Sequence, residues 1–139
     1  THTHGDHIAD LDSLRRGTHC QAALSHAKEP CPGTDTFDID GTTAWSLGAL
    51  RVEPRSTHGH ARGGVTYVIT GLAHPVAIVG DALFASSMGG GMVSYADALA
   101  TNRREIFTLP DDTILCPGHG PYTTVEEEKA HNPFYPEFK

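Results

Sequence analysis

The apolar residues near the start of the chain recur at a helical spacing. Ile8, Leu11 and Leu14 are three residues apart, and Gly17 follows them. Because residues three and four apart share one face of an α-helix, this spacing predicts a short amphipathic helix that ends at Gly17. Asp6 lies just before the apolar run, at the position where a capping side chain is expected.

Apolar and β-branched runs in the middle of the chain predict strands. Residues 65–70 and 76–79 are apolar enough to be buried strands. Residues 43–47 and 50–52 flank Gly48, which predicts a hairpin. The same reasoning predicts short strands over residues 20–24 and 113–116, and an irregular loop from Lys28 to Gly41.

Capping patterns indicate two helices in the second half of the chain. Ser94 and Asp97 have the spacing of a capping box, which predicts a helix over residues 94–109. Thr124 and Glu127 repeat that spacing before a last helix. Strands with helices between and after them predict a mixed α/β fold.

The composition is that of a globular protein. The chain has 139 residues and 38% hydrophobic residues, which suits one domain over residues 1–139. A formal net charge of −7 argues against nonspecific binding to nucleic acid and against docking on anionic lipid, because both need basic surface. No run of about 18 apolar residues is present, so no membrane-spanning helix is expected.

The cysteines indicate a reducing compartment. Cys20, Cys31 and Cys116 form no C-x-x-C pair and are too few for a disulfide framework. We therefore expect free thiols and a cytoplasmic protein.

The first seven residues carry four side chains that can bind a metal ion: His2, His4, Asp6 and His7. In an extended segment alternate side chains point to the same side, so the two imidazoles of His-x-His share one side. Imidazole and carboxylate together suit Zn²⁺, and also iron or manganese. The alternative interpretation is a solvated, histidine-rich tail.

Three later segments place a histidine or an aspartate beside glycine where a predicted strand begins or ends. They are Thr57–Gly64, Gly80–Phe84 and Pro117–Gly120. Loops at strand ends are where a rigid scaffold presents reactive groups. These three segments strengthen the metal-binding interpretation of the first seven residues.

This order of motifs, His-x-His-x-Asp-His, Gly-His, Gly-Asp and Gly-His-Gly, resembles the metallo-β-lactamase fold superfamily of hydrolases, from Thr1 to about Phe134. The C-terminal segment is similar to that of small glyoxalase II-like members. The resemblance implies an αβ/βα sandwich made of two similar halves. The first motif would follow the strands of the first half, so the N-terminal half of the fold is predicted to be missing and this chain to be mainly the C-terminal half.

The resemblance also implies two adjacent metal sites, with two zinc ions per chain and iron or manganese as alternatives. His2, His4 and His60 would hold the first ion; Asp6, His7 and His119 would hold the second; and Asp81 would bridge the two. His60 is preferred to His58 because the family's ligand follows a glycine. Asp6 would also act in catalysis, by orienting the attacking water.

The implied activity is hydrolysis of an ester, thioester or lactone-type bond of a small-molecule substrate by a metal-bound hydroxide. β-Lactams are disfavoured, because lactamases of the superfamily generally lack the aspartate found here as Asp81. A redox alternative is a persulfide dioxygenase with one iron, which His2, His60 and Asp81 would hold.

A third interpretation is a non-catalytic, metal-binding fragment that needs a partner chain. A sheet without the other half of the sandwich would expose an apolar face. We expect a homo-oligomer or a partner segment to cover that face.

Other conspicuous residues have ordinary structural interpretations. His19, His26, His74 and His131 are expected at the surface, and Trp45 and the phenylalanines in the core. The Gly89–Gly91 cluster lacks a phosphate-binding pattern and is expected to let a loop pass close to the metal ions.

Overall fold

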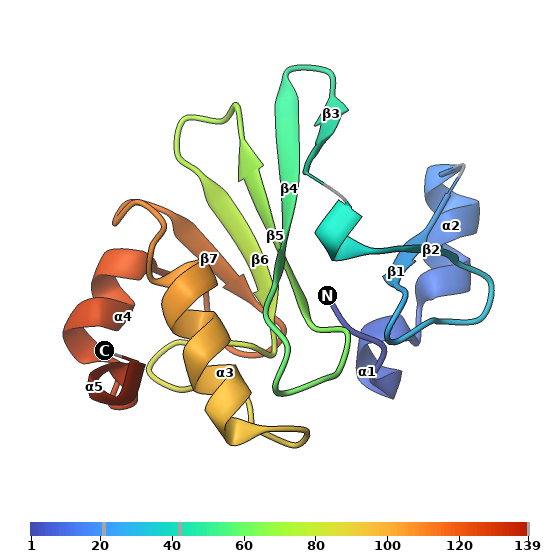
Figure 1. The fold of residues 1–139 in the computed structure, drawn as a ribbon. Helices are drawn as coiled ribbons and strands as arrows, with labels where there is room; N and C mark the ends of the chain where they lie inside the picture. The colour runs from blue at the N-terminus through green and yellow to red at the C-terminus, as the bar shows by residue number, and fades with distance from the viewer. Residues whose placement is uncertain (21, 42, 139) are drawn as a thin grey trace.

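A six-stranded sheet forms the centre of the computed structural model, which describes residues 1–20, 22–41 and 43–138 (Figure 1). All neighbouring strands are antiparallel except β6 and β7, which are parallel. A parallel pair needs a crossover connection, and α3 (Tyr95–Thr101) lies in it. The strands follow the order of the sequence: β3 (Trp45–Leu47), β4 (Leu50–Ser56), β5 (Val65–Thr70), β6 (Val76–Gly80), β7 (Ile114–Pro117) and β8 (Thr123–Thr124).

The strands predicted for this sheet are confirmed, with shifts at their ends. The predicted hairpin is the β3–β4 pair, and Gly48 in its turn has a φ of 62°, which glycine adopts without steric cost. β4 continues to Ser56 because it pairs with β5 along its whole length, from Arg51 opposite Thr70 to Ser56 opposite Val65. Such pairing between distant segments is not visible in local sequence.

Both predicted helix caps are present. The Ser94 hydroxyl accepts a hydrogen bond from the Asp97 amide, and the Thr124 hydroxyl accepts one from the Glu127 amide, at the starts of α3 and of α4 (Val125–His131). A further helix, α5 (Tyr135–Phe138), follows. Within the described ranges no helix has the length and apolar character needed to cross a membrane.

The prediction of a single helix over residues 94–109 is wrong. The helix changes at Asn102 into a π-helical segment, η2 (Asn102–Ile106). Asn102 is buried, and its side-chain amide donates to the Ala82 carbonyl at 2.8 Å. The helix therefore changes geometry where one side chain is fixed to the loop after β6.

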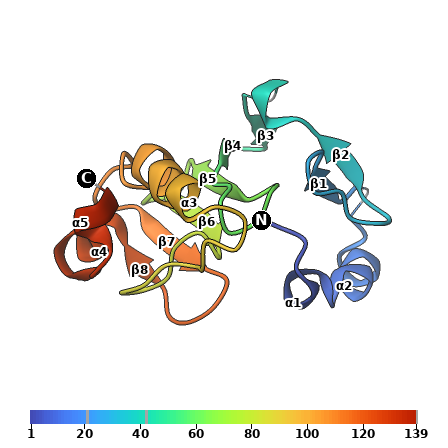
Figure 2. The same ribbon diagram turned by 60° about the horizontal axis from the view of Figure 1, so that its bottom comes forward.

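The N-terminal region lies beside the sheet, at the opposite end of the molecule from α4 and α5 (Figure 2). It consists of two short helices, a parallel two-stranded sheet and a 3₁₀ turn. The elements are α1 (Gly5–Ile8), α2 (Leu11–Thr18), β1 (Leu24–His26), β2 (Asp35–Phe37) and η1 (Ile39–Gly41).

Three predictions for this region are corrected. The helix is divided into α1 and α2, and Asp6 lies in the first turn of α1 rather than at its N-cap, which is His4. The expected loop from Lys28 to Gly41 contains β2 and η1, because residues 35–37 pair with β1. The strand predicted over residues 20–24 begins only at Leu24, and Gln21 lies outside the described residues.

The core lies between the sheet and the helices that follow it. Alternate residues of β5, β6 and β7 point to this side, and Val79 and Leu115 are almost fully buried there. Ile106 of η2 and Val125 of α4 pack into the same cluster. Close packing of these side chains fixes the helices on one face of the sheet.

The other face of the sheet is apolar and only partly covered. Ile78 is 40% exposed, and it lies between Tyr67 and Cys116 on the neighbouring strands. Aromatic contacts cover one end of this face, where Trp45 packs between Phe37 and Tyr67. A second row of half-buried residues completes the apolar face: Val52, Ile69, Val76 and Ile114.

Candidate metal centre

All seven residues predicted as metal ligands converge at one edge of the sheet. Asp81 directly follows β6 and His119 closely follows β7, and the ends of parallel strands meet at the same edge. His60 lies in the loop between β4 and β5. The N-terminal segment with His2, His4, Asp6 and His7 reaches this edge because the Thr1 carbonyl accepts a hydrogen bond from the Val65 amide.

His2, His4 and His60 form a first cluster. The His4 Nδ1 atom lies 3.1 Å from His2 Nε2 and 3.2 Å from His60 Nε2. One ring nitrogen from each residue lies within 4.8 Å of the other two. Three imidazoles arranged in this way match the donor set of zinc sites.

Asp6, His7 and His119 form a second cluster on the more exposed side. The Asp6 Oδ2 atom lies 3.0 Å from His119 Nε2 and 3.6 Å from His7 Nε2. Their ligand atoms also lie within 4.8 Å of one another.

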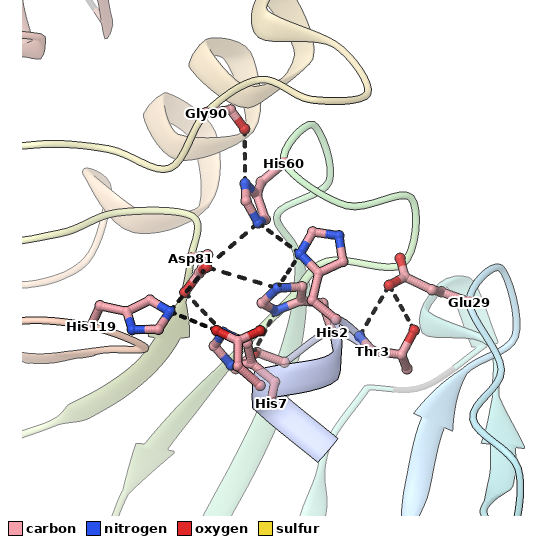
Figure 3. A network of polar contacts seen from close by, with 11 residues as sticks. His2, Thr3, His7, Glu29, His60, Asp81, Gly90 and His119 are labelled. Carbon is pink, nitrogen blue, oxygen red and sulfur yellow. Dashed lines mark hydrogen bonds and ion pairs between the residues drawn. The ribbon is translucent and has the colours of Figure 1, made fainter. Parts of the chain in front are cut away.

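The Asp81 carboxylate lies between the two clusters (Figure 3). Its Oδ1 atom is 3.2 Å from His7 Nε2, and its Oδ2 atom is 3.5 Å from His60 Nε2 and 3.6 Å from His119 Nε2. His2 Nε2 lies 3.9 Å from the same Oδ2 atom. One carboxylate therefore contacts residues of both clusters, which is the place of a bridging ligand.

Two buried atoms of this site have no hydrogen-bond partner, His7 Nε2 and Asp81 Oδ1. An unsatisfied buried polar atom costs about 1–3 kcal/mol, so such atoms are uncommon in folded proteins. A divalent cation among these donors would satisfy both of them. The donor set therefore fits a metal ion.

The protonation states suit metal binding. Burial, together with the neighbouring His7 and His4, lowers the pKa of His2 to about 4, so its imidazole is neutral at pH 7 and has a lone pair to offer. The Asp6 pKa is lowered by a hydrogen bond from its own backbone amide and by His7 and His119, so this exposed carboxylate is ionised.

The ring of His60 is oriented by a backbone carbonyl. Its Nδ1 atom lies 2.8 Å from the Gly90 carbonyl oxygen, which can only accept, so Nδ1 carries the proton. In the neutral ring the lone pair is then on Nε2, which points into the first cluster. The glycine cluster thus approaches the site as expected from the sequence.

Glycine is required where the backbone meets the ligands. A Cβ atom on Gly118 would collide with Asp81 Oδ1 and lie 2.5 Å from His7 Cε1. A Cβ atom on Gly89 would collide with the Asp81 carbonyl oxygen. The glycines beside the motifs therefore give the ligands space.

The loop that follows Asp81 is held by polar side chains that sequence reasoning missed. Glu128 is 1% exposed, and its carboxylate accepts a hydrogen bond from the Ser86 amide at 2.9 Å. The Asn132 side chain donates to the Ser87 carbonyl, and Asn102 donates to the Ala82 carbonyl. The only signal in the sequence is the presence of polar residues at core-facing helix positions.

The site opens toward solvent on the side of Asp6 and His119, whose side chains are more than half exposed. His2, on the opposite side, is buried. Behind it lies a cavity of about 180 Å³. The cavity is lined by parts of α1, α2, β1 and β5, among them Ile8, Leu11, Leu24 and Tyr67. A substrate would therefore approach from the side of Asp6 and His119.

The remaining histidines lie outside the centre. His58 Nδ1 lies 3.0 Å from the Ser56 hydroxyl. His19, His74 and His131 are exposed, as expected. The surface position expected for His26 is wrong, because this residue is 5% exposed and its ring packs against Phe37.

Comparison with known proteins places this arrangement in a family. The family model described as the metallo-beta-lactamase superfamily matches residues 1–119. A probable metallo-hydrolase of Streptococcus pyogenes is 31% identical, over 97% of this chain and 68% of that protein. The mitochondrial persulfide dioxygenase of Homo sapiens is 33% identical, over 96% of this chain and 54% of that protein. The hydroxyacylglutathione hydrolase of Citrobacter koseri is 29% identical, over 86% of this chain and 45% of that protein.

Solved structures show the same fold. The crystal structure of the BLEG-1 B3 metallo-beta-lactamase matches with a TM-score of 0.84 and 27% identity, over 96% of this chain and 74% of that one. The expected mixed α/β fold of the metallo-β-lactamase type is thus confirmed. The chain spans about half the length of the dioxygenase and of the hydroxyacylglutathione hydrolase.

His58 and His60 lie in the same loop, so replacing each of them in turn tests which one is a metal ligand. We expect His60→Ala to lower the bound metal, because the first cluster would keep only two imidazoles. The matched control His58→Ala should leave the metal content unchanged, because His58 contacts Ser56 instead. Metal content by mass spectrometry checks this, and an equal loss in both variants would contradict the assignment.

The close approach of Gly118 to Asp81 and His7 leads to a second prediction. We expect Gly118→Ala to lose bound metal, because the added methyl group would displace Asp81 and His7. The control Gly17→Ala adds the same group in α2, where it would meet no atom within 4 Å apart from its neighbours in the helix, and should keep the metal. Retention of the full metal content by Gly118→Ala would show that the ligands lie elsewhere.

Proposed function

Because this chain belongs to the metallo-beta-lactamase superfamily, we propose that it acts as a metal-dependent hydrolase on a small molecule with an ester, thioester or lactone bond. The observation that carries the proposal is the position of Asp81, whose carboxylate lies within 3.9 Å of nitrogen atoms of four histidines. Those histidines come from both clusters. One shared carboxylate suits two adjacent metal ions.

In this proposal His2, His4 and His60 would hold one ion, Asp6, His7 and His119 would hold the other, and Asp81 would be a ligand shared by the two. Zinc suits this set of imidazoles and carboxylates, and iron or manganese are alternatives. When bound, a divalent ion lowers the pKa of a coordinated water from 15.7 towards about 7 and polarises the oxygen of a carbonyl group.

The residues of the chain would bind and orient the reacting groups. Asp6 is exposed and ionised at the open side, so it can accept a hydrogen bond from the attacking water and orient it. On the opposite side His2 and Asp81 are buried, so water screens their interactions less than those of the exposed Asp6 and His119.

The choice of substrate rests on two points. A hydroxyacylglutathione hydrolase is among the relatives, and this name denotes cleavage of an acyl–glutathione bond. Asp81 occupies the position that, by the family resemblance, favours esters, thioesters and lactones over β-lactams. A β-lactam still belongs in the test panel, because the structure also matches a B3 metallo-beta-lactamase.

A persulfide dioxygenase with one iron is the second candidate. His2 and His60 lie 3.9 and 3.5 Å from Asp81 Oδ2, and two histidines with one carboxylate are typical of oxygen-activating iron sites. A relative with 33% identity has this name. Sulfite formation from glutathione persulfide, with one iron per chain, would favour it over the hydrolase.

Metal content and hydrolysis together test the main proposal. We expect about two zinc ions per chain, and we expect Asp81→Ala to lose metal and to lower thioester or lactone hydrolysis about a hundredfold or more. The control Asp112→Ala removes an aspartate that pairs with a histidine at the surface, His74, and should change neither property. A wild-type protein that binds no metal would contradict the proposal. One that binds metal but hydrolyses none of these substrates would favour the non-catalytic, metal-binding fragment.

A second element is proposed to cover the apolar face of the sheet, either a second copy of this chain or a partner segment. This proposal is supported by the row of apolar residues around Ile78, because the Ile78 side chain is 40% exposed. Apolar patches of this kind mark interaction surfaces.

The three free thiols, Cys20, Cys31 and Cys116, support the proposed cytoplasmic location.

Light scattering tests the covered face. We expect wild-type protein to have a mass well above 14.9 kDa, and we expect Ile78→Lys to dissociate it, because a charge cannot be buried against an apolar surface without a partner. The control Ala100→Lys places the same charge on the exposed side of α3. A monomeric wild type that also fails to bind a hydrophobic dye would contradict the proposal.

A further inference from the structure

Glu29 connects two loops that bear predicted metal ligands. Its Oε1 atom accepts hydrogen bonds from the Thr3 amide at 3.0 Å and from the Thr3 hydroxyl at 2.8 Å (Figure 3). Its Oε2 atom accepts one from the Gly63 amide at 2.8 Å. Thr3 lies between His2 and His4, and Gly63 lies in the loop that contains His60.

The two loops are far apart in sequence. Glu29 is 26 residues from Thr3 and 34 residues from Gly63, and it follows β1 in the N-terminal region. The first cluster exists only if His2 and His4 are held beside His60. Glu29 spans this gap with both carboxylate oxygens, and it does so without hydrogen bonding to any of the three histidines.

The contact is close and charge-assisted. A Cβ atom on Gly63 would lie 2.6 Å from the Glu29 Cβ atom, so this approach requires glycine. Burial raises the pKa of Glu29, but the donors from Gly63 and Thr3 outweigh it and hold the pKa below its usual value. Hydrogen bonds to an ionised carboxylate are about twice as strong as neutral ones.

We propose that Glu29 is a positioning residue, which fixes the first metal cluster by holding the Thr3 and Gly63 backbones at a set separation. We call the hydrogen bonds of Glu29 to these two residues the Glu29 clamp. The proposal rests on the metal binding proposed above. Replacing a residue that supports metal ligands from behind typically lowers metal affinity by a factor of about 10–100.

The shape of the carboxylate makes the proposal specific. In Glu29→Gln the amide nitrogen would replace one oxygen and would face a donor, either on Thr3 or on Gly63. In Glu29→Asp the chain is one methylene shorter and cannot reach both loops. Either change would loosen one loop and leave the histidines themselves intact.

The experiment measures zinc affinity of the folded protein by competition with a chromogenic chelator, and the visible spectrum of the cobalt-substituted protein. We expect Glu29→Gln to weaken one of the two ions about tenfold or more and to alter the cobalt spectrum, with the other ion unchanged. Thr3→Val removes only the hydroxyl donor and should have a smaller effect. Added to Glu29→Gln, it should cause a smaller further loss than it causes alone, because both changes act on one contact.

The matched control is Glu53→Gln. Glu53 is also half-buried and also uses both oxygens, with Arg51 at 2.6 Å and Arg55 at 2.8 Å, but it lies in β4 away from the ligands. This change should leave both zinc affinities and the cobalt spectrum as in the wild type. Equal effects of Glu53→Gln and Glu29→Gln would overturn the proposal, because they would show a general loss of stability.

Wild-type zinc affinity in Glu29→Gln would also overturn the proposal. If the wild type bound no metal, the proposed function would fail, and the clamp would be tested in the metal-free protein by amide hydrogen exchange. Faster exchange of the Thr3 and Gly63 amides in Glu29→Gln than in Glu53→Gln would support the clamp. Unchanged exchange would overturn it.

Discussion

The Asp81 carboxylate among four histidine nitrogens is the contact on which the site depends. It lies directly after β6, and the parallel pairing with β7 brings His119 to the same edge. Gly118 leaves space for this carboxylate, and Gly89 leaves space for the Asp81 backbone carbonyl. The loop behind it is held by Asn102, Glu128 and Asn132, so the helices that follow the sheet serve the site as well as the core.

The ligands come from two parts of the chain, the N-terminal region and the loops of the six-stranded sheet. The N-terminal region reaches the sheet through the Thr1–Val65 hydrogen bond, the Glu29 clamp and the aromatic contacts of Trp45. A metal ion bound to His2, His4 and His60 would add a further link across the same junction. Metal binding and the relative position of the two parts are therefore coupled, because ligands that must converge also stabilise the fold that brings them together.

The site was more predictable from sequence than parts of the fold. All seven predicted ligands converge. Residue type and spacing alone indicated the four N-terminal ligands, and the family resemblance implied His60, Asp81 and His119. β2 was missed, because its strand state comes from pairing with β1 and not from local apolar pattern. The change of helix type at Asn102 and the burial of His26 likewise depend on tertiary contacts. Glu29 gave no signal, since its partners are two backbone amides and one hydroxyl of distant residues.

The arrangement of the second cluster bears on the choice between one metal ion and two. A single iron held by His2, His60 and Asp81 would leave Asp6, His7 and His119 without a role as ligands. These three nevertheless lie within 4.8 Å of one another, and the buried His7 Nε2 atom has no hydrogen-bond partner. Such an atom is costly unless something binds it. The Asp81 Oδ1 atom lies 3.2 Å from this nitrogen and also has no hydrogen-bond partner, so one cation would satisfy both atoms. This shared deficit argues for a cation at the second cluster, which an iron held only by His2, His60 and Asp81 would not supply.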